Sequence, residues 1–197
     1  VYYESNIALA EQLKAITPQG LDMSFICQSG TESIEAAIKL AKYTSKRPGI
    51  GAFKGSFHGR TLGALSVTFS NPKYKMNYEP LLQNVYSAPY AYCYRCEKNN
   101  KRTKTVPIAE DDSFPKVDGC NLECLTETEE VIKNAGPANI GGLLVEPIQG
   151  EGGYIVPPKE FIKGLQDICQ KYDILLIFDE VQTGFGRPGK FFAAEHF

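Results

Sequence analysis

Short, uninterrupted runs of apolar residues alternate along the chain with longer stretches of helical spacing. The clearest runs are ILLIF at 174–178 and the middle of IGGLLVEPIQG at 140–150. An apolar run of this length indicates a strand that is buried on both faces, as strands of parallel sheets are. Shorter strands are predicted within GIGAFKG at 49–55 and NVYSAP at 84–89.

Helical spacing of apolar residues predicts helices at residues 7–16, 29–46, 125–133 and 158–173, and a loop that enters a helix at 58–68. The second helix has the most distinct start, because Ser29 and Glu32 match the S-x-x-E capping box. Strands that alternate with helices predict an α/β fold with a mainly parallel sheet flanked by helices.

Residues 90–121 break this alternation. They carry charges and prolines without a sustained period, which predicts a long insertion at the surface. Four of the six cysteines lie in the insertion or beside it, as C-x-x-C and C-x-x-x-C pairs: Cys93, Cys96, Cys120 and Cys124. The first pair has the spacing of metal ligands, so bound zinc or an iron–sulfur cluster, free thiols and disulfides all stay open. Cys27 and Cys169 have apolar neighbours and are predicted to lie in the core.

Composition narrows the class of protein. With 197 residues, of which 43% are hydrophobic and 22% charged, the chain has the size and balance of one globular domain. The net charge of −2 gives no electrostatic case for binding nucleic acid or an anionic membrane. No apolar stretch is long enough to span a membrane, and the first residues lack the layout of a signal peptide. Cysteines without such a signal favour a reducing compartment, so we expect a cytoplasmic location.

Carboxylates stand where two of the predicted strands end. Asp179 follows ILLIF, Glu146 follows LLV, and Glu151 lies in a glycine-rich turn just beyond. Ligands of open α/β sheets bind beyond the carboxyl ends of the strands, where an unpaired charge would be costly. Asp179 is therefore a candidate partner for a positive group on a ligand. The alternative for each acid is a role in a turn or a helix cap.

Two other segments carry candidate ligand contacts. In SGTE, Ser29, Gly30 and Thr31 lead into a helix N-terminus, whose free N–H groups suit a phosphate. Ser29 could equally act only as the helix cap. In GSFHGRT, Phe57 and His58 could stack on a flat ring, or could fill the core and cap a turn.

Four motifs together resemble the class III (ω-amino acid) aminotransferases: SGTESIEAAIKLA, FHGRTLGALS, VEPIQGEGG and LLIFDEVQTGFGRPGKFFAAEHF. These are pyridoxal 5′-phosphate (PLP) enzymes with the aspartate-aminotransferase fold, PLP fold type I. The resemblance covers nearly the whole chain apart from residues 90–121. It implies that residues 1–197 are part of the PLP-binding large domain.

The resemblance gives five residues a role in holding the cofactor. Asp179 would pair with the protonated pyridine nitrogen of PLP, and a carboxylate there keeps the ring cationic. Gln182 would hydrogen-bond the phenolic oxygen of the ring. Gly30 and Thr31, with Ser29 beside them, would hold the phosphate.

The same resemblance implies roles around the ring and the substrate. Phe57 would stack on one face of the ring, Val181 would press on the other, and His58 is the neighbour of the stacking residue. Two acids would act in catalysis. Glu146 would lie close to cofactor and substrate, and Glu151 matches the acid that pairs with an arginine in one half-reaction and releases it in the other.

The chain departs from this family at its C-terminal end. The Schiff-base lysine of the family would lie beyond Phe197, and Lys190 belongs to the GRPGKFF loop instead. The small domain and the arginine partner of Glu151 are also expected outside these residues, and the chain does not begin with Met. We therefore expect a piece of a longer enzyme that cannot transaminate by itself.

The parent enzyme is expected to be a homodimer that moves an amino group from an ω-amino donor to the 2-oxo acid 2-oxoglutarate. PYAYCYRC at 89–96 resembles a stretch of some 4-aminobutyrate aminotransferases, which favours 4-aminobutyrate as the donor. Acetylornithine or ornithine aminotransferases share the same motifs, and a racemase or mutase would use the same cofactor cradle. A non-catalytic binding or assembly module is the alternative from another class.

Overall fold

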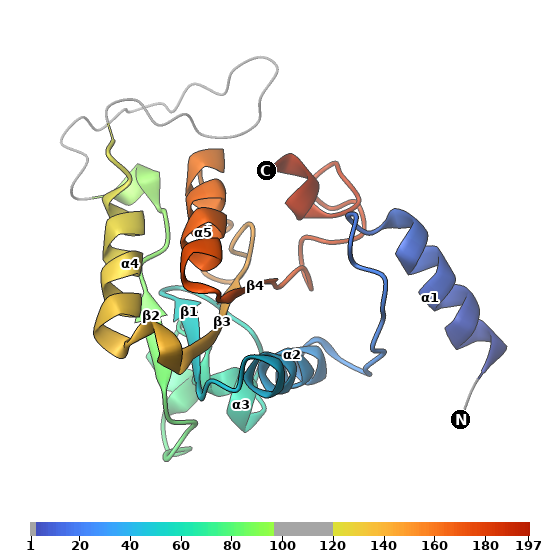
Figure 1. The fold of residues 1–197 in the computed structure, drawn as a ribbon, viewed down its shortest axis with the longest axis horizontal. Helices are drawn as coiled ribbons and strands as arrows, with labels where there is room; N and C mark the ends of the chain where they lie inside the picture. The colour runs from blue at the N-terminus through green and yellow to red at the C-terminus, as the bar shows by residue number, and fades with distance from the viewer. Residues whose placement is uncertain (1–2, 97–119) are drawn as a thin grey trace.

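A four-stranded parallel sheet with helices on both faces forms the centre of the molecule (Figure 1). The computed structural model describes residues 3–96 and 120–197. The strands are β1 Gly49–Phe53, β2 Val85–Ala88, β3 Ile140–Val145 and β4 Leu175–Phe178, in the order β2-β1-β3-β4. This confirms the predicted α/β class with a parallel sheet.

The helices occupy the segments where helical spacing predicts them, with ends that differ by a few residues. The α-helices are α1 Glu4–Ile16, α2 Gly30–Ser45, α3 Leu62–Ser66, α4 Glu123–Ala135 and α5 Lys159–Tyr172. The 3₁₀ turns are η1 Pro72–Lys75, η2 Cys93–Arg95, η3 Pro137–Asn139 and η4 Ala193–His196. Within the described ranges, no helix has the length and apolar character needed to cross a membrane.

The hydrophobic core has two halves, one on each face of the sheet. On the face covered by α4 and α5, the buried residues include Phe53, Val145, Ile132, Phe161 and Leu165. On the face covered by α2 and α3, they include Ile50, Leu144, Ile34, Ile38 and Ala64. Consecutive residues of β3 thus face opposite ways, as the pleat of a strand requires. β3 is buried along its whole length, as its apolar run predicts, and so is β1, for which the sequence predicts only a short strand.

The prediction that 174–178 is buried on both faces is wrong for most of that run. In β4, Leu175 is 44% exposed and the following residues are only half-buried. The strand pairs with β3 from Leu175 to Phe178, and among the described residues nothing pairs with its outer edge. Within the described part of the chain β4 is therefore an edge strand, and an apolar run alone does not distinguish an edge strand from a central one.

Two other predictions need correction at the borders of the sheet. Tyr90 and Ala91 belong to the buried core beside Phe53, so the irregular segment does not start at the surface. Residues 97–119 of that predicted insertion lie outside the described residues. Cys169 is buried as expected, but Cys27 is only half-buried, because the segment around it forms no strand and exposes Phe25.

The start of α2 shows a variant of the predicted capping box. The Ser29 hydroxyl accepts the Glu32 N–H at 3.3 Å, as a cap should. The Glu32 carboxylate accepts the N–H of Gln28 at 2.7 Å rather than that of Ser29. Two backbone donors at the helix entrance are satisfied in this way, which fixes where the chain enters α2.

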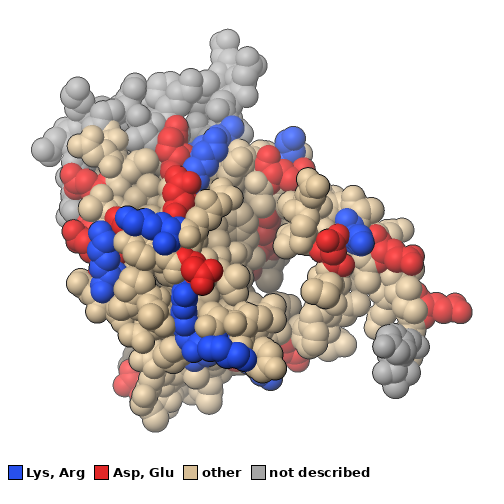
Figure 2. Space-filling model, in the orientation of Figure 1, with Lys and Arg blue, Asp and Glu red and all other residues tan. Residues whose placement is uncertain are grey.

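Charges of both signs are mixed over the surface. Figure 2 shows Lys and Arg side chains interspersed with Asp and Glu across the face that carries α4 and α5. Nucleic acid binding needs a one-sided basic surface, and this face does not provide one.

Candidate functional site

The carboxyl ends of β1, β3 and β4 meet at one edge of the sheet, next to the N-terminus of α2 (Figure 1). A cavity of about 480 Å³ opens there. Its lining residues are Gly30, Thr31, Phe57, His58, Gly59, Arg60, Thr61, Asp179 and Val181. The structure thus gathers six of the predicted site residues around one space, from three segments that are far apart in the sequence.

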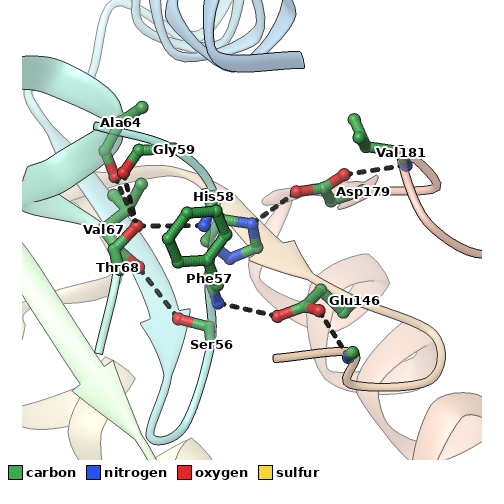
Figure 3. A network of polar contacts seen from close by, with 11 residues as sticks. Ser56, Phe57, His58, Gly59, Ala64, Val67, Thr68, Glu146, Asp179 and Val181 are labelled. Atoms are coloured by element: carbon green, nitrogen blue, oxygen red, sulfur yellow. Dashed lines mark hydrogen bonds and ion pairs between the residues drawn. The ribbon is translucent and has the colours of Figure 1, made fainter. Parts of the chain in front are cut away.

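A buried pair of side chains forms the floor of this site. The Nδ1 atom of His58 lies 2.7 Å from Oδ2 of Asp179, and the two residues are only 3% and 7% exposed (Figure 3). The other carboxylate oxygen, Oδ1, accepts the N–H of Val181 at 3.0 Å. A buried carboxylate needs such partners, because desolvation of an unpaired charge is costly.

Hydrogen bonds through Thr68 connect the backbone of His58 to α3. The N–H of His58 donates to Oγ1 of Thr68 at 2.9 Å, and that hydroxyl lies 2.9 Å from the Ala64 carbonyl at the C-terminal part of α3 (Figure 3). The Nε2 atom of His58 is buried and has no protein partner among the described residues. Buried polar atoms are nearly always satisfied, so an unsatisfied one beside a cavity is compatible with a bound group or a water.

Glu146 ties two loops of the site together. Its Oε1 accepts the N–H of Phe57 and its Oε2 accepts the N–H of Gly150, both at 2.8 Å (Figure 3). Burial raises the pKa of the Glu146 carboxyl above its ordinary value, and the two backbone donors partly offset that rise. Glu146 does not line the cavity, but it fixes the position of Phe57, which does.

Two glycines keep the entrance of the cavity open. A Cβ on Gly30 would lie 2.9 Å from Cγ2 of Val181. Gly59 has a φ of +129°, and a Cβ there would come within 2.4 Å of the Thr31 hydroxyl. That hydroxyl lies 2.9 Å from the hydroxyl of Thr61, which fastens the loop after His58 to the start of α2.

The remaining predicted residues lie outside the lining. Ser29 acts as the cap of α2, and the Gln182 side chain lies against Gly150. Glu151 is exposed and accepts a hydrogen bond from the hydroxyl of Tyr74 at 3.0 Å. The Tyr74 ring in turn packs edge-on against Phe57, with 5.9 Å between the ring centroids and 73° between the planes.

Sequence reasoning missed Arg60 and Tyr74. Arg60 is the one Lys or Arg side chain among the described residues that line the cavity. Its position directly after His58 and Gly59 was a signal that could have found it. Tyr74 comes from η1, and no local pattern marks its contact with Glu151.

The four paired cysteines are free thiols that border a different cavity, beside η2 and the start of α4. Within residues 3–96 and 120–197, no three side chains of the ligating types are already arranged to hold a metal ion. The predicted bound metal is therefore not shown.

Comparison with known proteins settles the family. The family described as "Aminotransferase class-III" matches residues 1–197. The chain belongs to the class III aminotransferases. It is 37% identical over 195 residues to the 4-aminobutyrate aminotransferase of Mycobacterium tuberculosis (strain ATCC 25618 / H37Rv), covering 98% of this chain and 40% of the relative. It is also 37% identical over 196 residues to the alanine/serine racemase of Pyrococcus horikoshii, covering 98% of this chain and 39% of that protein.

A solved structure confirms the fold type. The omega transaminase from Pseudomonas jessenii in complex with PMP aligns with a TM-score of 0.82 at 28% identity, covering 100% of this chain and 42% of that one. The class III chain therefore has the PLP fold type I architecture that the sequence motifs imply. It spans about 40% of the length of the curated relatives that it matches.

Proposed function

We propose that this class III chain forms part of the PLP-binding large domain of an aminotransferase, with the cofactor in the cavity at the end of β1, β3 and β4. The observation that carries the proposal is the buried His58–Asp179 pair, which lines one cavity together with Phe57 and Val181. A ring with a cationic nitrogen suits such a site, because Asp179 offers a carboxylate to the nitrogen and Phe57 and Val181 offer apolar surface to the ring.

The residues present fit such a cofactor. Gly30 and Thr31 are the first residues of α2, where backbone N–H groups without helical partners and the helix dipole suit a phosphate. Adding a Cβ at Gly30 would close this space against Val181. Phe57 and Val181 line the cavity together and would cover the ring.

The chemistry of PLP depends on the charge of Asp179. When bound, the cofactor supplies an electron sink for breaking a C–H bond next to an amino group. Asp179 would hold the proton on the ring nitrogen that makes the sink effective. His58 and the N–H of Val181 would orient that carboxylate, since each holds one of its oxygens.

The proposed substrates are an ω-amino donor, with 4-aminobutyrate favoured, and 2-oxoglutarate as acceptor. The 4-aminobutyrate aminotransferase relative supports this choice. Both substrates carry carboxylates, and Arg60 offers a guanidinium at the rim of the cavity. Acetylornithine or ornithine remains the alternative donor. We further propose that the complete enzyme is a homodimer in the cytoplasm, a reducing compartment that suits the free thiols. Glu151 is proposed as the acid that pairs with an arginine in one half-reaction and releases it in the other.

Cofactor binding can be tested directly on this chain by equilibrium dialysis against PLP. Asp179→Asn should weaken binding about ten- to a hundredfold, the loss expected for one charge-assisted hydrogen bond. Asp167→Asn, on the exposed side of α5, is the matched control and should bind like the wild type. Equal affinity of all three proteins would overturn the assignment of the cavity.

The reaction is tested separately by product analysis with the complete reading frame. Glutamate should form from 2-oxoglutarate only when 4-aminobutyrate or another amino donor is present. The similarity to an alanine/serine racemase suggests which other reaction to look for. Inversion of an amino acid without any 2-oxo acid acceptor would replace the transaminase proposal with a racemase.

A further inference from the structure

Four cysteines from two separate segments converge on one cavity of about 500 Å³. Cys93 and Cys96 come from η2 and the residue after it, and Cys120 and Cys124 lie on either side of the start of α4. None of the residues lining this cavity lines the proposed cofactor cavity. The proposed function makes no use of these thiols.

Backbone turns bring the members of each pair together. The N–H of Cys96 donates to the carbonyl of Cys93 at 3.3 Å, which closes the turn of the first pair. In the second pair, the N–H of Leu122 donates to the sulfur of Cys120 at 3.3 Å, with Leu122 in the left-handed conformation at a φ of 50°. This turn holds Cys120 just before the start of α4, and a cysteine thiolate is the form that binds metals.

The four thiols border the same cavity, and Cys93 and Cys124 are both partly buried there. Both residues pack against the core on the α4 and α5 face. Without a counterion, four thiolates in this space would repel each other. A divalent cation removes that repulsion and replaces the protons.

We propose that Cys93, Cys96, Cys120 and Cys124 bind one zinc ion and thereby clamp η2 to the start of α4. Four thiolates from two short-spaced pairs are a ligand set that tetrahedral Zn²⁺ prefers. Binding converts four S–H groups into four Zn–S bonds and releases their protons, with no change in oxidation state. The free thiols described here do not form a closed ligand set, so the ion would draw them together as it binds.

The charges around the cavity suit this assignment. A zinc ion with four thiolates carries a net charge of about −2. Lys54 and Arg95 line the same cavity and provide compensating positive charge. Glu123 and Glu127 also line it, so the surroundings carry charges of both signs rather than being acidic.

The test measures two quantities on the purified full chain: its zinc content by elemental mass spectrometry, and its number of reactive thiols. Wild-type protein loaded with zinc and then desalted should retain about one ion per chain. Serine substitution of Cys93, Cys96, Cys120 or Cys124 should reduce retained zinc at least tenfold. Cys27→Ser is the matched control, since Cys27 lies outside the cavity, and should retain the wild-type amount.

If a serine variant does not fold, removal of zinc from the wild-type protein with a chelator provides a second test. Stripping zinc from the wild type should increase the number of thiols that react with a chromogenic disulfide, and restoring zinc should reverse the increase. The proposal is overturned if wild type and Cys124→Ser retain equal zinc. It is also overturned if intact mass shows disulfides within the four, or if the metal found is iron with acid-labile sulfide.

Discussion

At the scale of single residues, the site depends on contacts that join distant segments. Asp179 uses one oxygen for His58 and the other for its own neighbour Val181. Both contacts hold the carboxylate at the end of β4 before any ligand arrives. Such preorganisation lowers the cost of placing a charge next to a cationic group.

Tyr74 connects the cavity residue Phe57 with Glu151, which lies outside the lining. The hydrogen bond to Glu151 raises the pKa of the Tyr74 phenol, because ionisation would place two negative charges side by side. Glu151→Gln should therefore lower that pKa toward its ordinary value. The check is ultraviolet titration of tyrosinate in wild-type and Glu151→Gln proteins, each compared with its Tyr74→Phe counterpart to isolate this phenol. An identical Tyr74 titration in both backgrounds would contradict the contact.

Tyr74 also shows what reasoning from single residues could not supply. Asp179 and Phe57 could be identified as candidates because each stands at a predicted strand end or in a loop beyond one. The engagement of Glu151 by Tyr74 depends on how η1 folds back over Phe57. No periodicity in the sequence encodes that approach, so the partner of this acid could not be predicted.

At the scale of elements, one carboxylate joins the two helices that cover the same face of the sheet. Glu129 of α4 accepts hydrogen bonds from Lys171 at 2.7 Å and from the Tyr172 hydroxyl at 2.6 Å, both at the end of α5. Lys133, one turn along α4, adds an ion pair at 3.4 Å. Together these contacts fix the end of α5 against α4.

The effect of Glu129 on stability should depend on pH. Its hydrogen bonds with Lys171 and Tyr172 lower the pKa of the Glu129 carboxyl from 4.5 to about 2. Because the pKa is depressed in the folded state, the contribution is full above the ordinary pKa and fades as the pH falls from 4.5 toward 2.

Glu129→Gln should thus lower the urea midpoint at neutral pH and have progressively less effect under acid conditions. Glu130→Gln, on the exposed side of the same turn, is the control and should leave the midpoint unchanged at both pH values. A difference between wild type and Glu129→Gln that is constant from neutral to acid pH would contradict this account.

The burial of a strand could be predicted from its apolar residues where the strand lies in the middle of the sheet. β1 and β3 are central strands, and their apolar runs match their burial on both faces. The run at β4 looks the same in sequence but forms an edge. An apolar run indicates that a strand prefers to be buried, but it does not indicate how many strands pair with it.

At the scale of the whole molecule, stability rests on the two halves of the core. Leu165 of α5 is fully buried between α4 and the sheet, whereas Leu40 of α2 is 61% exposed. Leu165→Ala should lower the free energy of unfolding by about 2–5 kcal/mol, and Leu40→Ala by about 0.5 kcal/mol or less. Urea denaturation of the two variants measures both values with the same chemical change. Equal losses would show that the buried half-core does not carry the stability assigned to it.

The outer edge of β4 has a consequence for handling the protein. The strand LLIF carries no charge and no proline, which are two of the features with which natural edges resist pairing. Among the described residues no strand pairs with its outward N–H and C=O groups, and another chain can offer them hydrogen bonds. Rising protein concentration therefore favours ladders between copies over solvated monomers, and a charged residue in place of Leu175 is the change that would keep the protein dispersed.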